Sequence, residues 1–291
     1  MIFAENLKTP EGPVALADGT WLVVEMGADA GCVTQLSSDG KTKRAIYRTG
    51  RPNGLAVDRD GYIWVAESQV PSLCRLTLDG TLRVMLVEDD LGEPFLFPND
   101  LAFGPDGALY LTDSGILHAD FVPGGQIHPQ YATLKYDGRV YRIDTKTRAI
   151  TTLDRGVRFT NGIAFDAAGN LYANETVTGN VYRYAAKGGG RFGGRELYGN
   201  VIDAAAPQGF KGPDGMKFGA DGNLYCAVYG QGDVTVLGRN GQVVKRIKTH
   251  GDLPTNLAFG LPGDTRIYVT EVQHGRLEAH DVGCEGLALH K

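Results

Sequence analysis

Six polar residues recur at one fixed position of a short repeated phrase, and they are the residues of this sequence best suited to act together. The phrase is a polar residue, a small or polar residue and an apolar run, and we call its first position the anchor residue. The anchor residues are Glu11, Asn53, Asn99, Asn161, Asp214 and Thr255. All but Thr255 offer a carboxylate or amide oxygen, and Asn256 adds an amide one place out of phase. Such oxygens predict a site for one divalent ion, with Ca²⁺ favoured and Mg²⁺, Mn²⁺ or Zn²⁺ as alternatives.

A turn is the competing interpretation of each anchor residue, because Asn-Gly and Asp-Gly are common turn sequences. Oxygen-bearing side chains at one phase of a repeat favour a site over unrelated turns. The histidines show no His-x-His or His-Glu-x-x-His spacing, so a nitrogen-rich zinc site is not expected. No Gly-x-Ser-x-Gly phrase provides a serine nucleophile, so any hydrolysis would depend on the ion and on a carboxylate that activates water.

The anchor residues begin short strands, and these strands predict the fold. Each phrase leads through a turn into a second apolar strand, such as 62–65 or 267–270, at intervals of roughly 40 to 60 residues. This pattern is typical of an all-β, six-bladed β-propeller of four-stranded antiparallel blades, and we expect residues 1–291 to form one domain. The strand candidate 2–4 is expected to close the ring by joining the last blade.

The chain reverses direction within each blade, and this places all anchor residues on one face of the propeller. They begin the innermost strands and are expected to surround the top of the central channel. An insertion at about 114–138 lengthens the third blade on the same face, and we expect it to act as a lid. It contains His118, His128 and Tyr131, of which His128 is a candidate substrate contact.

A second set of acids closes the second strand of most blades, and we call its members the strand-end acids. They are Glu25, Glu67, Asp113, Glu175 and Glu271. Acids at such positions accept backbone hydrogen bonds or pair with arginine, and this structural interpretation is favoured. Asp113 is the exception, because the insertion starts beside it, and it is a candidate for substrate binding.

Composition restricts the partners of the protein. A net charge of −5 argues against nucleic-acid binding, because phosphate affinity requires a basic surface. No apolar run approaches ~18 residues, which argues against a membrane span, and no signal peptide is evident. The resulting expectation is a cytoplasmic protein that acts on a small molecule, as a monomer or weak homo-oligomer.

Four of the repeated phrases together resemble those of a known family. They are Glu11-Gly12-Pro13, Asn99-Asp100, Asn161-Gly162 and Pro213-Asp214-Gly215-Met216. In this order they are similar to the metal-site phrases of the senescence marker protein 30/gluconolactonase/luciferin-regenerating enzyme-like family, and the similarity covers nearly the whole chain. The resemblance implies a six-bladed propeller with one catalytic divalent metal in the channel, held by Glu11, Asn161 and Asp214.

The resemblance also implies roles for single residues. Asn99 matches a position that is a metal ligand or a substrate contact, depending on the member, and Asp214 matches the position proposed as general base. We therefore expect Asp214 and Asn99 to be catalytic, and Asn53 to orient substrate or complete the metal shell. Animal members carry a substrate-contacting arginine two residues before the Asn-Asp pair, where this chain has Phe97.

Three hypotheses follow. The first is a metal-dependent hydrolase that opens a sugar lactone or a related lactone, in which the ion polarises the carbonyl and a carboxylate assists the attacking water. The second is a hydrolase or lyase on the same metal that acts on an organophosphate or another ester, as in the similar diisopropylfluorophosphatase. The third is a non-catalytic propeller that binds a partner protein through an apolar patch.

Overall fold

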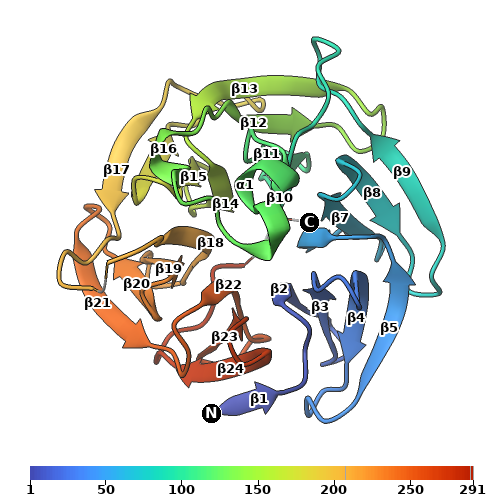
Figure 1. Cartoon of the computed structure of the whole chain (residues 1–291), viewed down its shortest axis with the longest axis vertical. Helices are drawn as coiled ribbons and strands as arrows, with labels where there is room; N and C mark the ends of the chain where they lie inside the picture. The colour runs from blue at the N-terminus through green and yellow to red at the C-terminus, as the bar shows by residue number, and fades with distance from the viewer. Residues whose placement is uncertain (207, 289, 291) are drawn as a thin grey trace.

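Six four-stranded antiparallel sheets are arranged radially around a common axis (Figure 1). The structure is a computed structural model that describes residues 1–206, 208–288 and 290. The innermost strand of each sheet contacts the innermost strands of both neighbouring sheets, which closes the ring. The prediction of an all-β, six-bladed propeller with four-stranded antiparallel blades is confirmed.

Each blade contributes one strand to each of four concentric layers. The innermost strands are β2 (Pro10–Ala15), β6 (Pro52–Val57), β10 (Pro98–Phe103), β14 (Thr160–Phe165), β18 (Gly212–Phe218) and β22 (Pro254–Phe259). The second strands are β3 (Trp21–Glu25), β7 (Ile63–Glu67), β11 (Leu109–Asp113), β15 (Leu171–Glu175), β19 (Leu224–Tyr229) and β23 (Arg266–Glu271). The third strands are β4 (Cys32–Leu36), β8 (Ser72–Leu76), β12 (Gly138–Ile143), β16 (Asn180–Tyr184), β20 (Asp233–Leu237) and β24 (Arg276–Asp281). The outer strands are β5 (Lys43–Arg48), β9 (Leu82–Leu86), β13 (Ile150–Val157), β17 (Glu196–Asn200), β21 (Val243–Lys248) and β1 (Ile2–Ala4).

The N-terminal strand closes the ring, as the sequence predicted. β1 pairs antiparallel with β24, and Ile2 lies opposite Glu278. The sixth blade thus combines the N-terminal strand β1 with β22, β23 and β24, which covers a strand edge that would otherwise be open. Phe3 of β1 packs edge-on against Trp21 and Tyr268, so the closure also joins the first and sixth blades.

Apolar side chains pack between neighbouring blades and hold the ring rigid. Trp64 of the second blade lies in one buried cluster with Leu101 and Tyr141 of the third. The second strands are almost entirely buried, whereas outer strands such as β5 and β21 are mostly exposed. Burial on both faces of the inner layers fixes the innermost strands relative to one another.

Residues 114–137 form the insertion between β11 and β12, close to the predicted bounds of about 114–138. It contains the helix α1 (His118–Phe121) and two 3₁₀ turns, η1 (Pro123–Gly125) and η2 (Tyr131–Thr133). Figure 1 shows α1 drawn over the middle of the ring. Phe121 packs against Phe159, just before β14, and against Phe210, just before β18. The insertion therefore reaches across the face on which the innermost strands begin. No helix in the described part of the chain has the length and apolar character needed to cross a membrane.

Candidate active site

Each innermost strand is irregular at its anchor residue. The register with the second strand shifts between Glu11 and Val14 in β2, and at the equivalent place in β6, β10, β14 and β18. A β-bulge re-aims side chains, and bulges are common beside active sites. Glu11 and Asp214, from the first and fifth blades, are close enough to influence each other electrostatically. The bulges thus bring anchor side chains from distant blades together.

Neighbouring blades fix one another's anchor residues through the backbone. Thr112 Oγ1 donates to the Asn161 carbonyl oxygen at 2.5 Å, and Asn174 Nδ2 donates to the Asp214 carbonyl oxygen at 2.6 Å. Glycine follows Asn161 because a Cβ at Gly162 would lie 2.2 Å from the Asp214 carbonyl oxygen. These close approaches set the spacing between anchor residues of adjacent blades.

Three carboxyl groups, those of Glu11, Asp214 and Asp100, interact electrostatically, and we call them and the anchor residues around them the central site. Glu11 is only 1% exposed. Its burial, and then the negative charges of Asp214 and Asp100, raise the pKa of Glu11 well above its usual value. Burial and Asp100 raise the pKa of Asp214, although a side-chain hydrogen bond with Asn161 opposes the shift. Buried like charges are costly, so the central site favours an additional cation.

Two anchor residues also have amide oxygens without a partner. Asn99 Oδ1 and Asn161 Oδ1 are buried and accept no hydrogen bond within the described residues. Asn99 Nδ2 donates to Ser114 Oγ at 2.9 Å, which fixes the orientation of the amide and leaves its oxygen free. Buried polar atoms normally have a partner. Together with the carboxylates of Glu11 and Asp214, these amides form a set of hard oxygen donors that fits a divalent ion such as Ca²⁺.

Arg51 brings a positive charge to the same region. Its guanidinium carbon lies 5.3 Å from the centre of the Phe97 ring. Burial lowers the pKa of Arg51 to about 10, and the charges of Glu67, Glu11 and Asp214 oppose this shift. Arg51 therefore stays charged at neutral pH, beside the carboxyl groups of the central site.

The insertion places His118 next to Arg51. The His118 ring meets Phe97 edge-on, with 5.5 Å between ring centres. Burial and the charge of Arg51 lower the pKa of His118 to about 4, so its imidazole is neutral at neutral pH. Phe97 also forms a buried apolar cluster with Phe121 and Phe159. The central site is thus bordered by an apolar wall, a neutral imidazole and the guanidinium of Arg51, and Lys217 Nζ lies 3.7 Å from Asp100 Oδ2.

The geometry gives no support to the predicted substrate contact of Asp113. Its side chain is completely buried. Its two oxygens accept hydrogen bonds at 2.8 to 3.0 Å from the backbone N–H groups of Leu96, Phe97 and Gly115. Because no oxygen is left open to a ligand, the structural interpretation of the strand-end acids applies to Asp113 as well.

The remaining predicted contacts, Asn53 and His128, are placed differently. Asn53 is buried at the bulge of β6, at the same level as the other anchor residues. His128 lies in the insertion, and its Nδ1 accepts a hydrogen bond from the Gln130 backbone N–H at 3.1 Å. His128 therefore supports a turn of the insertion, whereas His118 is the histidine that the structure places beside Arg51.

Sequence reasoning gave no role to Asp100 or Arg51, although both shape the electrostatics of the central site. A signal for Asp100 lies in the position after each anchor residue, which is glycine in four copies and polar only at Asp100 and Asn256. Asn256 Nδ2 donates to Glu11 Oε1 at 3.2 Å, so this position reaches the centre in both blades. Arg51 stands two residues before an anchor residue, the position that Phe97 occupies in the next blade.

The fold and the central site define a class of protein, a six-bladed propeller with an acidic, oxygen-rich centre under an apolar cover. Comparison with known proteins places the chain within that class. The model of the SMP-30/Gluconolactonase/LRE-like region matches residues 9–273. The chain belongs to this family, as its repeated phrases indicated.

Two curated relatives match most of the chain. A gluconolactonase from Zymomonas mobilis subsp. mobilis is 26% identical over 283 residues, covering 91% of this chain and 76% of the relative. A diisopropyl-fluorophosphatase from Loligo vulgaris is 28% identical over 288 residues, covering 92% and 87%. Among solved structures, a calcium-binding protein, regucalcin, from Agrobacterium tumefaciens has a TM-score of 0.77 and 22% identity, covering 100% of this chain and 96% of that one. The structural likeness shows the shared fold.

Proposed function

We propose that the protein is a divalent-metal-dependent hydrolase that opens lactones. The observation that carries this proposal is the pair of buried carboxyl groups, Glu11 and Asp214, with raised pKa values beside unpartnered amide oxygens. A cation held by Glu11, Asn161 and Asp214, with Asn99 as a further ligand or a substrate contact, would neutralise the buried carboxylates. It would also give the buried amide oxygens a partner. The relatives support a hydrolase, and the calcium-binding structural neighbour makes Ca²⁺ the first ion to test.

The chain's own groups would handle the proton. The ion, when bound, supplies the Lewis acidity that polarises the lactone carbonyl. A carboxylate oxygen of Asp214 accepts a proton from the attacking water as the new C–O bond forms. The same carboxyl group then returns the proton to the ring oxygen as the ring C–O bond breaks, which yields a hydroxy acid. Asn99, fixed by Ser114, and Asn53 orient the substrate during these steps.

Arg51 and its surroundings narrow the substrate class. A guanidinium recognises carboxylate, phosphoryl or carbonyl oxygens through charge-assisted hydrogen bonds. The adjacent cluster of Phe97, Phe121 and Phe159 is apolar and excludes water. This combination favours a lactone with one anionic group and an apolar remainder over a fully hydroxylated sugar lactone.

An organophosphate is the second candidate substrate. The apolar wall favours it, because a neutral phosphotriester has no hydroxyl group to satisfy, and the Loligo vulgaris relative is named diisopropyl-fluorophosphatase. The same carboxylates and amide oxygens of the central site would serve this reaction.

The experiment is an assay of metal-stripped protein restored with Ca²⁺, Mg²⁺, Mn²⁺ or Zn²⁺. The substrates are gluconolactone, an apolar lactone, a lactone with a carboxylate substituent and a fluorophosphate. We expect ion-dependent hydrolysis, with the carboxylate-bearing lactone giving the highest kcat/KM. Asp214→Asn should abolish turnover, whereas Asp252→Asn, an exposed aspartate before β22, should retain it. Full activity of the metal-free wild type would overturn the proposal.

A further inference from the structure

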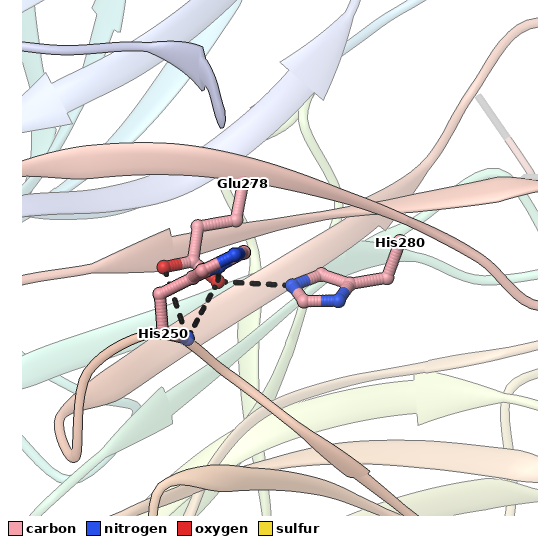
Figure 2. A group of neighbouring side chains, drawn as sticks. All are labelled: His250, Glu278 and His280. Atoms are coloured by element: carbon pink, nitrogen blue, oxygen red, sulfur yellow. Dashed lines mark hydrogen bonds and ion pairs between the residues drawn. The ribbon is translucent and has the colours of Figure 1, made fainter. Parts of the chain in front are cut away.

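Three side chains that take no part in the central site converge where the fifth blade passes into the sixth. His250 lies in the connection between β21 and β22, and Glu278 and His280 lie on β24 (Figure 2). Figure 2 shows the two imidazole rings directed at the Glu278 carboxylate. Glu278 Oε2 lies 3.0 Å from His250 Nδ1 and 2.9 Å from His280 Nε2. One donor atom from each residue lies within 4.8 Å of the others.

The Glu278 carboxylate has hydrogen-bond donors but no lysine or arginine partner within the described residues. Its side chain is 0% exposed, and its ion-pair contacts within the described residues are to histidine and not to lysine or arginine. A buried carboxylate needs a cation or several donors. Glu278 therefore presents a buried carboxylate oxygen to one imidazole nitrogen of each histidine.

We propose that His250, Glu278 and His280 form a second, peripheral metal site that takes Zn²⁺ or a similar transition-metal ion. Two imidazole nitrogens and one carboxylate oxygen are a ligand set that zinc uses in proteins. Ligands at about 2.0–2.1 Å from a tetrahedral ion lie roughly 3.3 Å apart. The two separations from Glu278 Oε2, 3.0 and 2.9 Å, need to widen by a few tenths of an ångström, and the two imidazole nitrogens lie within 4.8 Å of each other.

Access and chemistry both separate this site from the central one. The His250 side chain is 46% exposed, so an ion can enter from solvent and a water molecule can complete the coordination. The central site offers oxygen donors alone, which suit Ca²⁺, whereas imidazole nitrogen favours zinc, copper or nickel. The sequence gave no signal because the ligands come from segments far apart in the chain, and spacing rules detect only neighbours.

Binding at this site would also stabilise the closure of the ring. Glu278 pairs with Ile2 of β1, and the His250 backbone N–H donates to the Glu278 carboxylate at 3.1 Å. An ion that joins β24 to the connection before β22 therefore acts on the blade in which the N-terminal strand β1 pairs with β24. Anything that binds the folded state more tightly than the unfolded state raises stability.

The test uses the full chain with the central site disabled by Glu11→Gln and Asp214→Asn. Zinc is titrated into this metal-stripped protein in competition with a chromophoric chelator, and metal content is measured by plasma mass spectrometry after dialysis. We expect about one zinc per chain, a higher Tm with zinc, and affinity that falls more than ~100-fold with His250→Ala or His280→Ala. Circular dichroism checks folding, and the exposed position of His250 makes His250→Ala the safer variant.

His274→Ala is the matched control. His274 Nδ1 also lies 3.0 Å from a buried glutamate, Glu271, but this pair has no second histidine. Zinc affinity should be unchanged in this variant. The proposal is overturned if the protein with the disabled central site binds no zinc, or if His250→Ala and His280→Ala bind it as tightly as His274→Ala. Neither result depends on lactone hydrolysis, so this experiment tests the second metal site independently of the proposed function.

Discussion

The anchor residues and the strand-end acids are two sets of polar side chains at fixed phases of the same repeat, yet their surroundings are opposite. Glu271 accepts hydrogen bonds from three backbone N–H groups, those of Leu253, Gln273 and His274. Glu25 accepts one from the Lys8 backbone and one from Lys43 Nζ. Glu11 also accepts hydrogen bonds, from the Gly12 backbone N–H and from Asn256 Nδ2, but unlike the strand-end acids it is subject to the negative charges of Asp214 and Asp100. The recurrence of an acidic residue at one phase of the repeat therefore does not tell a ligand-binding residue from a structural one. The hydrogen-bond donors and the charges around each carboxyl group do.

The two sets are also connected. Each strand-end acid binds the backbone just before the innermost strand of its own blade, and so holds the segment that leads into an anchor residue. Glu67 accepts from the Arg51 N–H at 2.8 Å, and Glu175 accepts from the Arg158 N–H at 2.8 Å. The strand-end acids thus position the backbone that leads into the anchor residues of their own blades, and substitutions in the two sets should have different consequences.

The largest effect is expected from Asp214→Asn. Losing the proposed ligand and general base should lower kcat/KM by ~10³-fold or more, which corresponds to several kcal/mol of transition-state stabilisation. Stability of the metal-free protein should not fall, because the change removes repulsion with Glu11 and Asp100. Lactone assays and urea unfolding of metal-stripped protein measure the two effects. A variant that fails to fold would assign Asp214 to the scaffold.

Asp113→Ala is expected to give the converse result. It leaves three buried backbone N–H groups without an acceptor, so the free energy of unfolding should fall by about 3 kcal/mol. The kcat/KM of the folded fraction should change far less than with Asp214→Asn. Denaturant titration and assays at low temperature check this. Unchanged stability together with lost activity would restore the role in substrate binding.

Arg51→Met tests whether the guanidinium serves the substrate. A charge-assisted hydrogen bond is worth about 1.5–3 kcal/mol, so KM for a carboxylate-bearing lactone should rise roughly 10- to 100-fold. KM for an uncharged apolar lactone should stay nearly constant. Arg44→Met, on the exposed outer strand β5, is the matched control. Equal losses for both substrates would mean that Arg51 only supports the local fold.

The smallest predicted effect is on the pH dependence of stability, which should differ between variants of Glu11 and of Glu25. The pKa of Glu11 is raised from 4.5, so the metal-free protein should lose stability as pH rises through the raised value. Glu11→Gln should then be more stable than wild type at about pH 8, and equal to it at about pH 4. The pKa of Glu25 is lowered by Lys43, Thr34 and Lys8 against the effect of burial. The contribution of Glu25 to stability is therefore present above pH 4.5 and is lost as the pH falls through the lowered pKa.

Glu25→Gln should therefore be less stable than wild type near neutral pH, and this gap should close in acid. Thermal melting of the metal-stripped variants across this pH range tests the pair of predictions. If Tm changed with pH in the same way for Glu11→Gln and Glu25→Gln, the anchor residues and strand-end acids would not differ in electrostatic environment.

The sequence was sufficient for the fold because the repeat combines strand periodicity with turn residues in every blade. It also named Glu11, Asn161 and Asp214 as candidate metal ligands, because their phase in the repeat and the family phrases agree, and that role stays a prediction. The sequence could not decide whether Asp113 has a structural role or contacts a ligand. The N–H groups that donate to its carboxylate lie in loops whose path no sequence pattern predicts. Arg51 and His118 were hidden for a similar reason, because they meet at Phe97 only through the folding of the insertion.

The most direct test of the central claim is a crystal structure of the wild-type protein soaked in Mn²⁺, with anomalous scattering used to locate the ion. We predict one anomalous peak at the propeller axis, in contact with Glu11, Asn161 and Asp214, and no peak there in Asp214→Asn crystals. Well-ordered density at saturating Mn²⁺ with no ion among these three side chains would contradict the account.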